Sequence, residues 1–312
     1  MLPAPRFENS LFPMELREFK MFRTLIHRHT GIWLRDGKQI MLASRLSRRL
    51  RHHGISSFAE YYNYLQTHPG SDELREMINC VTTNKTSFYR ERHHFDFLAN
   101  TVVPEVQAAV LRGGPRSIRV WSAASSTGEE PYTIAITLLE ALQSPNRANS
   151  PQLPPGNTGI AKSHLTLNSW KIEVVASDID TKVLDTARRA TYPEDSLTGI
   201  ALPLKKKYFL RGKDDMLGQV RVKQDVARLV RFFHLNLMDT NWPLEGVFDG
   251  IFFRNALIYF NQDTQEIFLR KMVRFLKPRG YLFLGNAEHV PWIHDVLEPL
   301  NKTMYRLRGA ER

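Results

Sequence analysis

The sequence predicts an α/β protein built on a doubly wound, mostly parallel sheet, with an N-terminal all-helical domain and a small inserted antiparallel β-subdomain. Three observations predict this fold class. Apolar residues recur at helical spacing up to about residue 95, and strand-like runs are scarce there. β-rich runs then alternate with helical stretches, which is the pattern of a parallel sheet with crossover helices. Two alternating runs in the basic segment 203–235, Gln219–Lys223 and Leu229–Phe233, predict the inserted subdomain.

The helical domain, with its linker, is expected over residues 1–95. Its first helix follows an apolar stripe, and a second is predicted over Gln39–His53, which Gly54 terminates. A capping box at Ser57–Glu60 opens a third helix, and Ser71–Cys80 predicts a fourth.

The sheet domain is expected over residues 96–312. Its parallel strands are predicted at 117–124, 171–177, 250–253 and 280–285, and an antiparallel closing strand at 303–307. Helices are predicted between them at 131–142, 182–190 and 262–276. The segment 143–168 is rich in Pro, Ser, Asn and Gly, so it is expected to be an exposed insertion.

The composition limits the possible compartments and partners. No run approaches about 20 apolar residues, which excludes a membrane helix, and residues 1–10 lack the apolar core of an export signal. The single Cys80 excludes an internal disulfide and suits a reducing cytoplasm, which is the expected location.

The net charge of +11 is concentrated toward the N-terminus. Residues 1–95 carry 15 Lys and Arg against 9 Asp and Glu, an excess of +6. This excess predicts an acidic partner, and on charge alone nucleic acid, anionic lipid and an acidic protein surface all remain open. Arg45, Arg48 and Arg49 share one helix face, which is either a docking surface or a merely solvated face.

The most informative run is Val120–Tyr132, where a buried strand breaks into a turn of small residues and a helix follows at Pro131. Such a turn lets a ligand approach the backbone at a helix N-terminus. The pair Glu129–Glu130 would repel a pyrophosphate, so a cationic ligand such as S-adenosylmethionine is favoured. Because only one glycine is present, an ordinary strand-to-helix turn remains an alternative.

Two further runs place polar residues at predicted strand ends. Asp178 and Asp180 follow the second strand, and we expect Asp180 to cap the next helix while Asp178 binds ribose hydroxyls. Arg254 and Asn255 end a later strand, and Tyr259 follows four residues on. Ligands of doubly wound sheets bind beyond these strand ends, although local turn bonds would explain the same residues.

The run Thr82–Glu91 precedes the sheet domain and is dense in hydroxyls, amides and arginine, which suits a helix cap or a lid over a cofactor. No His-Glu-x-x-His spacing or Gly-x-Ser-x-Gly motif is present, so neither a metal nor a serine hydrolase is expected.

Taken together and in this order, these runs resemble the CheR family of chemoreceptor glutamate O-methyltransferases, from about Met14 to Leu307. Four motifs carry the resemblance, and each is matched in register: Thr82–Glu91, Ser126–Tyr132, Ala176–Asp180 and Arg254–Phe260. It implies a Rossmann-like S-adenosylmethionine-binding domain, an N-terminal receptor-binding domain, and methyl transfer to glutamate carboxylates, leaving S-adenosyl-L-homocysteine.

The resemblance also implies residue roles. The residues matching cofactor contacts are Asn84, Thr86, Arg90, Glu130, Asp178, Asn236, Leu237, Arg254 and Asn255. Arg90 and Tyr259 match residues that orient the substrate carboxylate, which makes them the catalytic candidates. Arg45, Arg48 and Arg49 would dock the acidic cytoplasmic domain of a receptor.

The implied partners are methyl-accepting chemoreceptors, with no nucleic acid bound, no membrane insertion and a monomeric enzyme. Phe253 replaces a frequent family cysteine, and Gly285–Glu288 departs from the pattern Gly-His-Ser-Glu. Two alternatives stay open: a nucleic-acid methyltransferase, which the basic charge favours, and a non-catalytic cofactor-binding signalling module.

Overall fold

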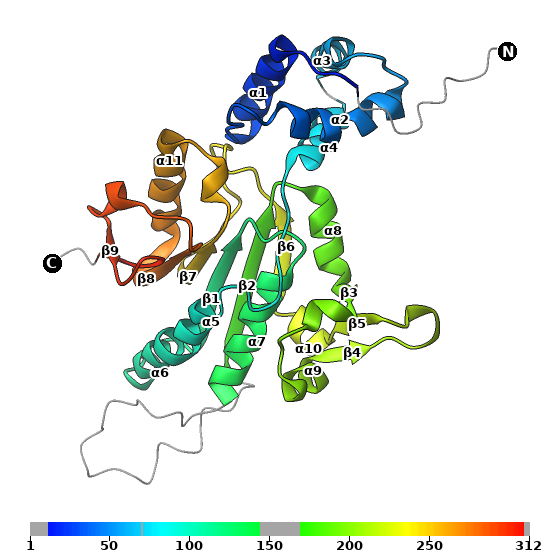
Figure 1. Ribbon diagram of the computed structural model, residues 1–312. Helices are drawn as coiled ribbons and strands as arrows, with labels where there is room; N and C mark the ends of the chain where they lie inside the picture. The colour runs from blue at the N-terminus through cyan, green and yellow to red at the C-terminus, as the bar shows by residue number, and fades with distance from the viewer. Residues whose placement is uncertain (1–11, 70, 144–168, 309–312) are drawn as a thin grey trace, which may run out of the picture. The chain divides into compact units, whose positions relative to one another are not determined.

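A computed structural model describes residues 12–69, 71–143 and 169–308 and divides the chain into two compact units (Figure 1). The first unit contains residues up to Thr83 together with Asn236–Asn241 and Tyr259–Thr264, and the second contains the rest from Asn84 onward. Apart from its first residue, the predicted insertion at 143–168 lies outside the described residues.

The first unit is helical, as the apolar spacing predicts. Its helices are α1 (Leu16–Thr30), α2 (Gln39–His53), α3 (Phe58–Thr67) and α4 (Glu73–Val81). Gly31 and Gly54 terminate α1 and α2 in the left-handed conformation, and the Ser57 side chain caps α3 by accepting from the Glu60 amide.

The apolar stripes of these helices meet in one core. Leu42, Leu46 and Leu50 of α2 are fully buried, and the ring of Phe22 stacks on that of Tyr61 at 5.9 Å. Helical periodicity therefore placed the core of this unit correctly.

The second unit contains a seven-stranded sheet in the order β6-β2-β1-β7-β8-β10-β9 (Figure 1). The strands are β1 (Ser117–Ala123), β2 (Lys171–Asp178), β6 (Val230–His234), β7 (Phe248–Phe253), β8 (Leu276–Leu284), β9 (Leu297–Pro299) and β10 (Met304–Leu307). The first five in this order pair in parallel, and β10 runs antiparallel to β8 and β9. The doubly wound sheet with an antiparallel closing strand is confirmed.

Helices alternate with these strands. They are α5 (His93–Phe97), α6 (Val103–Leu111), α7 (Glu129–Gln143), α8 (Thr181–Arg189), α9 (Leu202–Tyr208), α10 (Gln224–Ala227) and α11 (Gln262–Met272). A π-helical turn at Leu98–Val102 joins α5 to α6, and α7 packs against β1 and β2. Helix α7 begins at Glu129, so Pro131 is its third residue and not its first as predicted. The first turn tolerates this because its N–H groups have no helical acceptor.

The inserted antiparallel sheet is present, and the predicted run Gln219–Lys223 forms one of its strands, whereas the run Leu229–Phe233 does not. Its order is β3-β5-β4, with β3 at Thr191–Pro193, β4 at Phe209–Arg211 and β5 at Gln219–Val222. The run at 229–233 belongs mostly to β6, which pairs in parallel with β2 at the edge of the main sheet. Alternating polarity marks any half-buried strand, so the pattern could not distinguish an edge strand from a strand of the subdomain.

Candidate active site

The carboxyl ends of β2, β1 and β7 lie side by side in the second unit. Ala123 pairs with Ser177 across β1 and β2, and Ser122 pairs with Phe252 across β1 and β7. The loops that follow these strands carry three of the motifs singled out in the sequence. Parallel pairing therefore brings them to one edge, where doubly wound sheets bind ligands.

The turn after β1 is tightly folded. Ala124 and Ser126 adopt left-handed φ values of 60° and 51°, which are costly for residues with a Cβ. The Ser125 amide donates to the Ser177 carbonyl at 2.9 Å, and the Ser126 amide donates to Asp178 Oδ2 at 2.8 Å. Hydrogen bonds to β2 thus hold this turn in its strained form.

Asp178 and Asp180 lie at the end of β2, and the capping role predicted for Asp180 is confirmed. Asp180 caps α8 by accepting from the amides of Lys182 and Val183, and it also accepts from Asn84 Nδ2 at 2.7 Å. Asp178 is buried, and burial raises the pKa of its carboxyl to about 6. Its Oδ1 accepts from the Asp180 amide at 2.9 Å, so the structure shows Asp178 organising the loop. Its contact to a cofactor stays a prediction.

An ion-pair cluster lies where β1 and β7 end. Arg254 is 5% exposed and donates through Nη1 to Glu130 Oε2 at 2.9 Å and through Nη2 to Glu91 Oε2 at 3.1 Å. Ser122 Oγ donates to Glu130 Oε1 at 2.7 Å. Burial raises the pKa of Glu130, whereas the pKa of Glu91 is lowered on balance by Asn255 and Arg254, which outweigh its desolvation.

Glu91, a partner of Arg254, is the last residue of the Thr82–Glu91 motif. The sequence did not predict this structural role. Besides Arg254, the Glu91 carboxylate accepts from Asn255 Nδ2 at 3.1 Å and from the Asn286 amide at 3.3 Å. It therefore ties the segment that precedes α5 to the loops after β7 and β8.

Glu288 is a buried carboxylate whose role sequence reasoning missed. It accepts from the backbone amides of Asn255 at 2.9 Å, Ile258 at 3.3 Å and Gly285 at 2.6 Å. Asn255 has a left-handed φ of 58°, so this carboxylate holds the loop after β7 in a strained form. Its place in the late Gly-x-x-Glu run was the available clue.

Three of the predicted contact residues lie in the segment before α5. The Ser126 hydroxyl donates to the Asn84 carbonyl at 2.8 Å, which fixes the start of this segment against the turn after β1. Arg90 is half-buried, and its Nη1 donates to the Lys85 carbonyl at 2.7 Å. Thr86 is half-buried between them.

The other predicted contact residues belong to the first unit. Asn236 Nδ2 donates to the His29 carbonyl at 2.6 Å, and Leu237 follows it. The Tyr259 carbonyl accepts from the Trp33 amide at 2.7 Å. Asn236, Leu237 and Tyr259 belong to the first unit. Their roles toward the cofactor and the substrate stay predictions.

The basic face of α2 is engaged within its own unit. Arg45 donates to the carbonyls of Val81 and Thr82 at the end of α4, and Arg48 reaches Cys80 Sγ at 3.1 Å. Arg49 forms an ion pair with Glu73, which is buried. All three side chains therefore bind α4 or the residues just after it, and a docking role stays a prediction.

Buried polar atoms that lack a hydrogen-bond partner indicate whether the site fits S-adenosylmethionine. Among the described residues, Ser125 Oγ and Arg254 Nε are buried without a hydrogen-bond partner. The cofactor's amino-acid end offers a carboxylate and an amine for such atoms. The buried Glu129 and Asp178 and the half-buried Glu130 are acids that complement its sulfonium and hydroxyls. The residues present fit the cofactor.

The described residues contain neither a membrane-spanning helix nor a metal-binding cluster. No helix within them is long and apolar enough to cross a bilayer. No group of three or more His, Cys, Asp and Glu side chains within them could hold a metal ion.

Comparison with known proteins supports the fit. The family description "CheR methyltransferase, SAM binding domain" matches residues 84–150 and 160–306, and "CheR methyltransferase, all-alpha domain" matches 17–82. Chemotaxis protein methyltransferase 2 of Pseudomonas aeruginosa is 41% identical over 303 residues, covering 97% of each chain. Chemotaxis protein methyltransferase of Escherichia coli is 40% identical over 289 residues, covering 93% of this chain and 90% of the relative.

Proposed function

Because the chain belongs to the CheR family of methyltransferases, we propose that it methylates glutamate carboxylates on the cytoplasmic helices of chemoreceptors. The enzyme binds S-adenosylmethionine, as its matched SAM-binding domain indicates. The observation that carries the proposal is the acidic edge of the sheet, where the buried Arg254 lies between Glu91 and Glu130. We further propose that the enzyme is cytoplasmic and monomeric and that it does not bind nucleic acid.

The chemistry requires no general base. A glutamate side chain has a pKa of about 4.3, so the acceptor carboxylate is already ionised at neutral pH. When bound, S-adenosylmethionine supplies a methyl group activated by the adjacent sulfonium. The work left to the protein is to hold the two reactants in line and to exclude water.

Arg90 is the residue proposed to orient the acceptor carboxylate, with Tyr259 donating a second hydrogen bond. Both Nη groups of Arg254 are already bound to carboxylates, whereas the described contact of Arg90 is to a backbone carbonyl. A guanidinium bound to a neutral acceptor is the better candidate to meet an incoming anion.

Asn84, Thr86, Glu130, Asp178, Asn236, Leu237, Arg254 and Asn255 are proposed to shape the cofactor site. Asp178 would accept from the ribose hydroxyls, and Glu130 would act through Arg254 and Ser122, which it already binds. The Asn236–Leu237 pair is proposed to contact the adenine.

The decisive experiment uses methyl-labelled S-adenosylmethionine and a receptor-containing membrane fraction. Mild alkali releases volatile methanol from carboxyl methyl esters and not from methylated bases or amines. We expect volatile label from the wild type and a loss of at least roughly 100-fold in kcat/KM for Arg90→Ala. Arg92→Ala is the matched control, because Arg92 is exposed and pairs only loosely with Asp96 at 3.8 Å.

The remaining outcomes select between the alternatives. Alkali-stable label would move the function to nucleic acid or amine substrates. Cofactor binding without incorporation into any fraction would favour a non-catalytic module. Normal turnover by Arg90→Ala would remove Arg90 from the proposed mechanism.

A further inference from the structure

A pocket lies at the amino ends of the parallel strands in the second unit, at the opposite end of the sheet from the candidate active site. Its walls come from α6 and from the first residues of β1, β7 and β8, and its volume is about 570 Å³. Sites for small molecules measure roughly 300–1,000 Å³. We call this cavity the α6–β8 pocket. Asp249 in its wall and Arg254 in the candidate active site are separated by the length of β7, roughly 16 Å at the usual rise of a strand.

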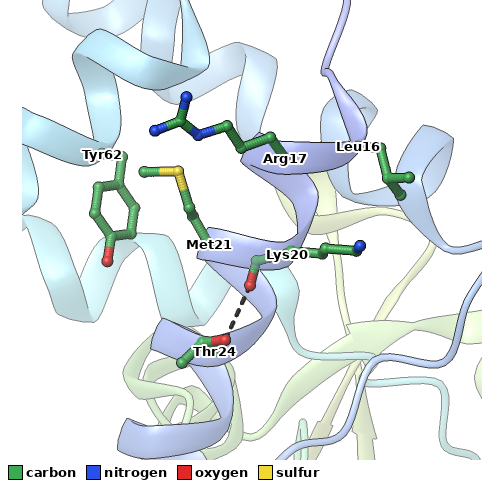
Figure 2. A pocket seen from close by; sticks show the side chains of 6 residues that line it. All are labelled: Leu16, Arg17, Lys20, Met21, Thr24 and Tyr62. Carbon is green, nitrogen blue, oxygen red and sulfur yellow. Dashed lines mark hydrogen bonds between the residues drawn. The ribbon is translucent and has the colours of Figure 1, made fainter.

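A pocket of similar volume lies on α1 in the first unit, but its lining side chains diverge (Figure 2). Arg17 and Met21 extend toward Tyr62, whereas Leu16 and Lys20 point away from it. That surface presents no single face to one ligand, so the α6–β8 pocket is the better candidate for a binding site.

Glu105 and Asp249, the carboxylates of the α6–β8 pocket, are already paired. The two oxygens of Asp249 accept from Lys277 Nζ at 2.8 Å and 2.9 Å. Glu105 accepts from Tyr281 Oη at 2.7 Å and from Arg306 Nη2 at 2.5 Å. Because the negative charge of the lining is neutralised by these partners, it does not oppose an incoming anion.

Arg112 and Arg279 give the pocket its unbalanced positive charge. Both are exposed members of the lining, and neither side chain forms a hydrogen bond or an ion pair in the part of the chain that the structure describes. Guanidinium groups bind phosphate oxygens in bidentate pairs. Two unpaired guanidinium groups also match the double charge of a phosphate ester better than the single charge of a carboxylate.

The backbone at Arg279 is strained. Phe248 of β7 pairs with Leu276 of β8, and Gly250 pairs with Tyr281, so residues 277–280 bulge out of the strand opposite a single residue of β7. Within this bulge Arg279 adopts a left-handed φ of 62°, a conformation that glycine would adopt without cost. A strained arginine on the wall of a pocket points to a role in binding a ligand.

Apolar surface lies beside the two arginines. Val106 and Ala109 of α6 are half-buried in the lining, and Pro278 of the bulge lines it as well. Small-molecule sites typically combine such apolar walls with a few polar groups that fix the ligand's orientation. The ligand should therefore carry an apolar body next to its anionic group.

We propose that the α6–β8 pocket binds a small organic phosphate. Its phosphate group would meet Arg112 and Arg279, and its apolar body would cover Val106 and Ala109. Because the pocket and the cofactor edge lie at opposite ends of the strands, this ligand and S-adenosylmethionine bind together. Neither the ligand nor its site depends on which methyl acceptor the enzyme uses.

Phosphorus NMR of phenyl phosphate added to the full-length enzyme tests the site. The titration is run with and without saturating S-adenosyl-L-homocysteine, which occupies the cofactor site. We expect saturable binding in both, with a Kd of about 1 mM or below, and binding of inorganic phosphate weaker by roughly fivefold or more. Uridine monophosphate is titrated in parallel: tighter binding than phenyl phosphate would support a nucleotide as the organic phosphate, and weaker binding would support an aryl phosphate.

Arg279→Gly is the most informative variant, because it removes a cation and relieves the strained φ. Its melting temperature should equal or exceed that of the wild type, while the Kd for phenyl phosphate rises by roughly fivefold. Adding Arg112→Gln should raise the Kd by roughly 20-fold in total. The matched control is Arg188→Gln with Arg228→Gln, which makes the same change in net charge at exposed residues outside the pocket. It should keep the Kd within about twofold of the wild-type value.

Absence of saturable binding by every phosphate tested would overturn the proposal. An equal loss of affinity in the control would also overturn it, because the attraction would then be a general effect of net charge. Loss of probe binding when S-adenosyl-L-homocysteine is present would assign the phosphate to the cofactor site, and equal affinity for inorganic phosphate would refute the apolar wall. A rise in Kd confined to the pocket variants would support the proposal.

Discussion

Replacing Arg49 with alanine tests whether the basic face of α2 supports the fold of its unit. The Arg49 guanidinium is only 12% exposed and donates through Nε to Glu73 Oε1 at 2.8 Å and through Nη2 to Oε2. The same carboxylate accepts from Tyr61 Oη at 2.6 Å and lies 2.7 Å from His53 Nε2. Arg49→Ala would leave a buried carboxylate without its cation.

Breaking a buried ion pair by removing one partner costs about 3–5 kcal/mol. Taking about 3 kcal/mol, the equilibrium for opening the α2–α4 contact should shift by roughly 150-fold. Hydrogen exchange followed by mass spectrometry measures this opening peptide by peptide, so the second unit serves as an internal reference. Peptides covering α2 and α4 should lose protection from exchange, and peptides of the second unit should keep theirs.

The control is Arg75→Ala, which removes an exposed pair with Asp72 on the same unit. That pair should contribute less than about 1 kcal/mol, so protection in α2 and α4 should hardly change. Equal exchange in the two variants would refute the structural role of Arg49. A rise in the receptor KM at unchanged protection would return Arg49 to the docking surface.

Three further predictions follow from buried groups. The pKa of Glu73 is lowered to about 2, so its ion pair should stabilise the helical unit fully above pH 4.5 and progressively less as the pH falls toward 2, which acid unfolding followed by circular dichroism would show. The pKa of Asp178 is raised to about 6, so cofactor affinity should fall as the pH drops below 6. Titration calorimetry should show that Asp178→Asn binds weakly and without this pH dependence. Gly285→Ala would place a Cβ 2.8 Å from the Asn255 nitrogen, so it should lower the melting temperature by an amount equivalent to about 1–3 kcal/mol, and an unchanged melting temperature would contradict the packing described.

The fold was predictable where one periodicity dominated. The bounds of α2 match the expected helix because its leucine stripe and the helix-terminating Gly54 both indicated the same segment. The β-subdomain was harder, because β6 is half-buried or exposed throughout, like a strand of a small exposed sheet. Only its hydrogen-bonded partner, β2, decides its place, and pairing between residues 56 positions apart leaves no local pattern.

The sequence predicted which strand ends form the site, but it did not predict the hydrogen bonds and ion pairs between the loops there. Motif order placed Glu130, Asp178 and Arg254 at one edge, and parallel pairing confirms that edge. Sequence could not show that Glu91 shares Arg254, or that Glu288 binds three backbone amides, because neither role leaves a periodic signature. Such contacts follow from the close approach of loops that are distant in sequence.

The two arginines of the site can now be distinguished by their partners. Arg254 binds Glu91 and Glu130, and separating it from them would leave a buried guanidinium and two half-buried carboxylates unpaired, which is a cost of several kcal/mol. An acceptor carboxylate would have to exceed that cost to recruit both Nη groups of Arg254. The side chain of Arg90 meets only the Lys85 carbonyl among the described residues, so an incoming carboxylate displaces a neutral acceptor there. Burial and pairing thus favour Arg254 as the residue that organises the edge of the sheet and Arg90 as the one that meets the substrate.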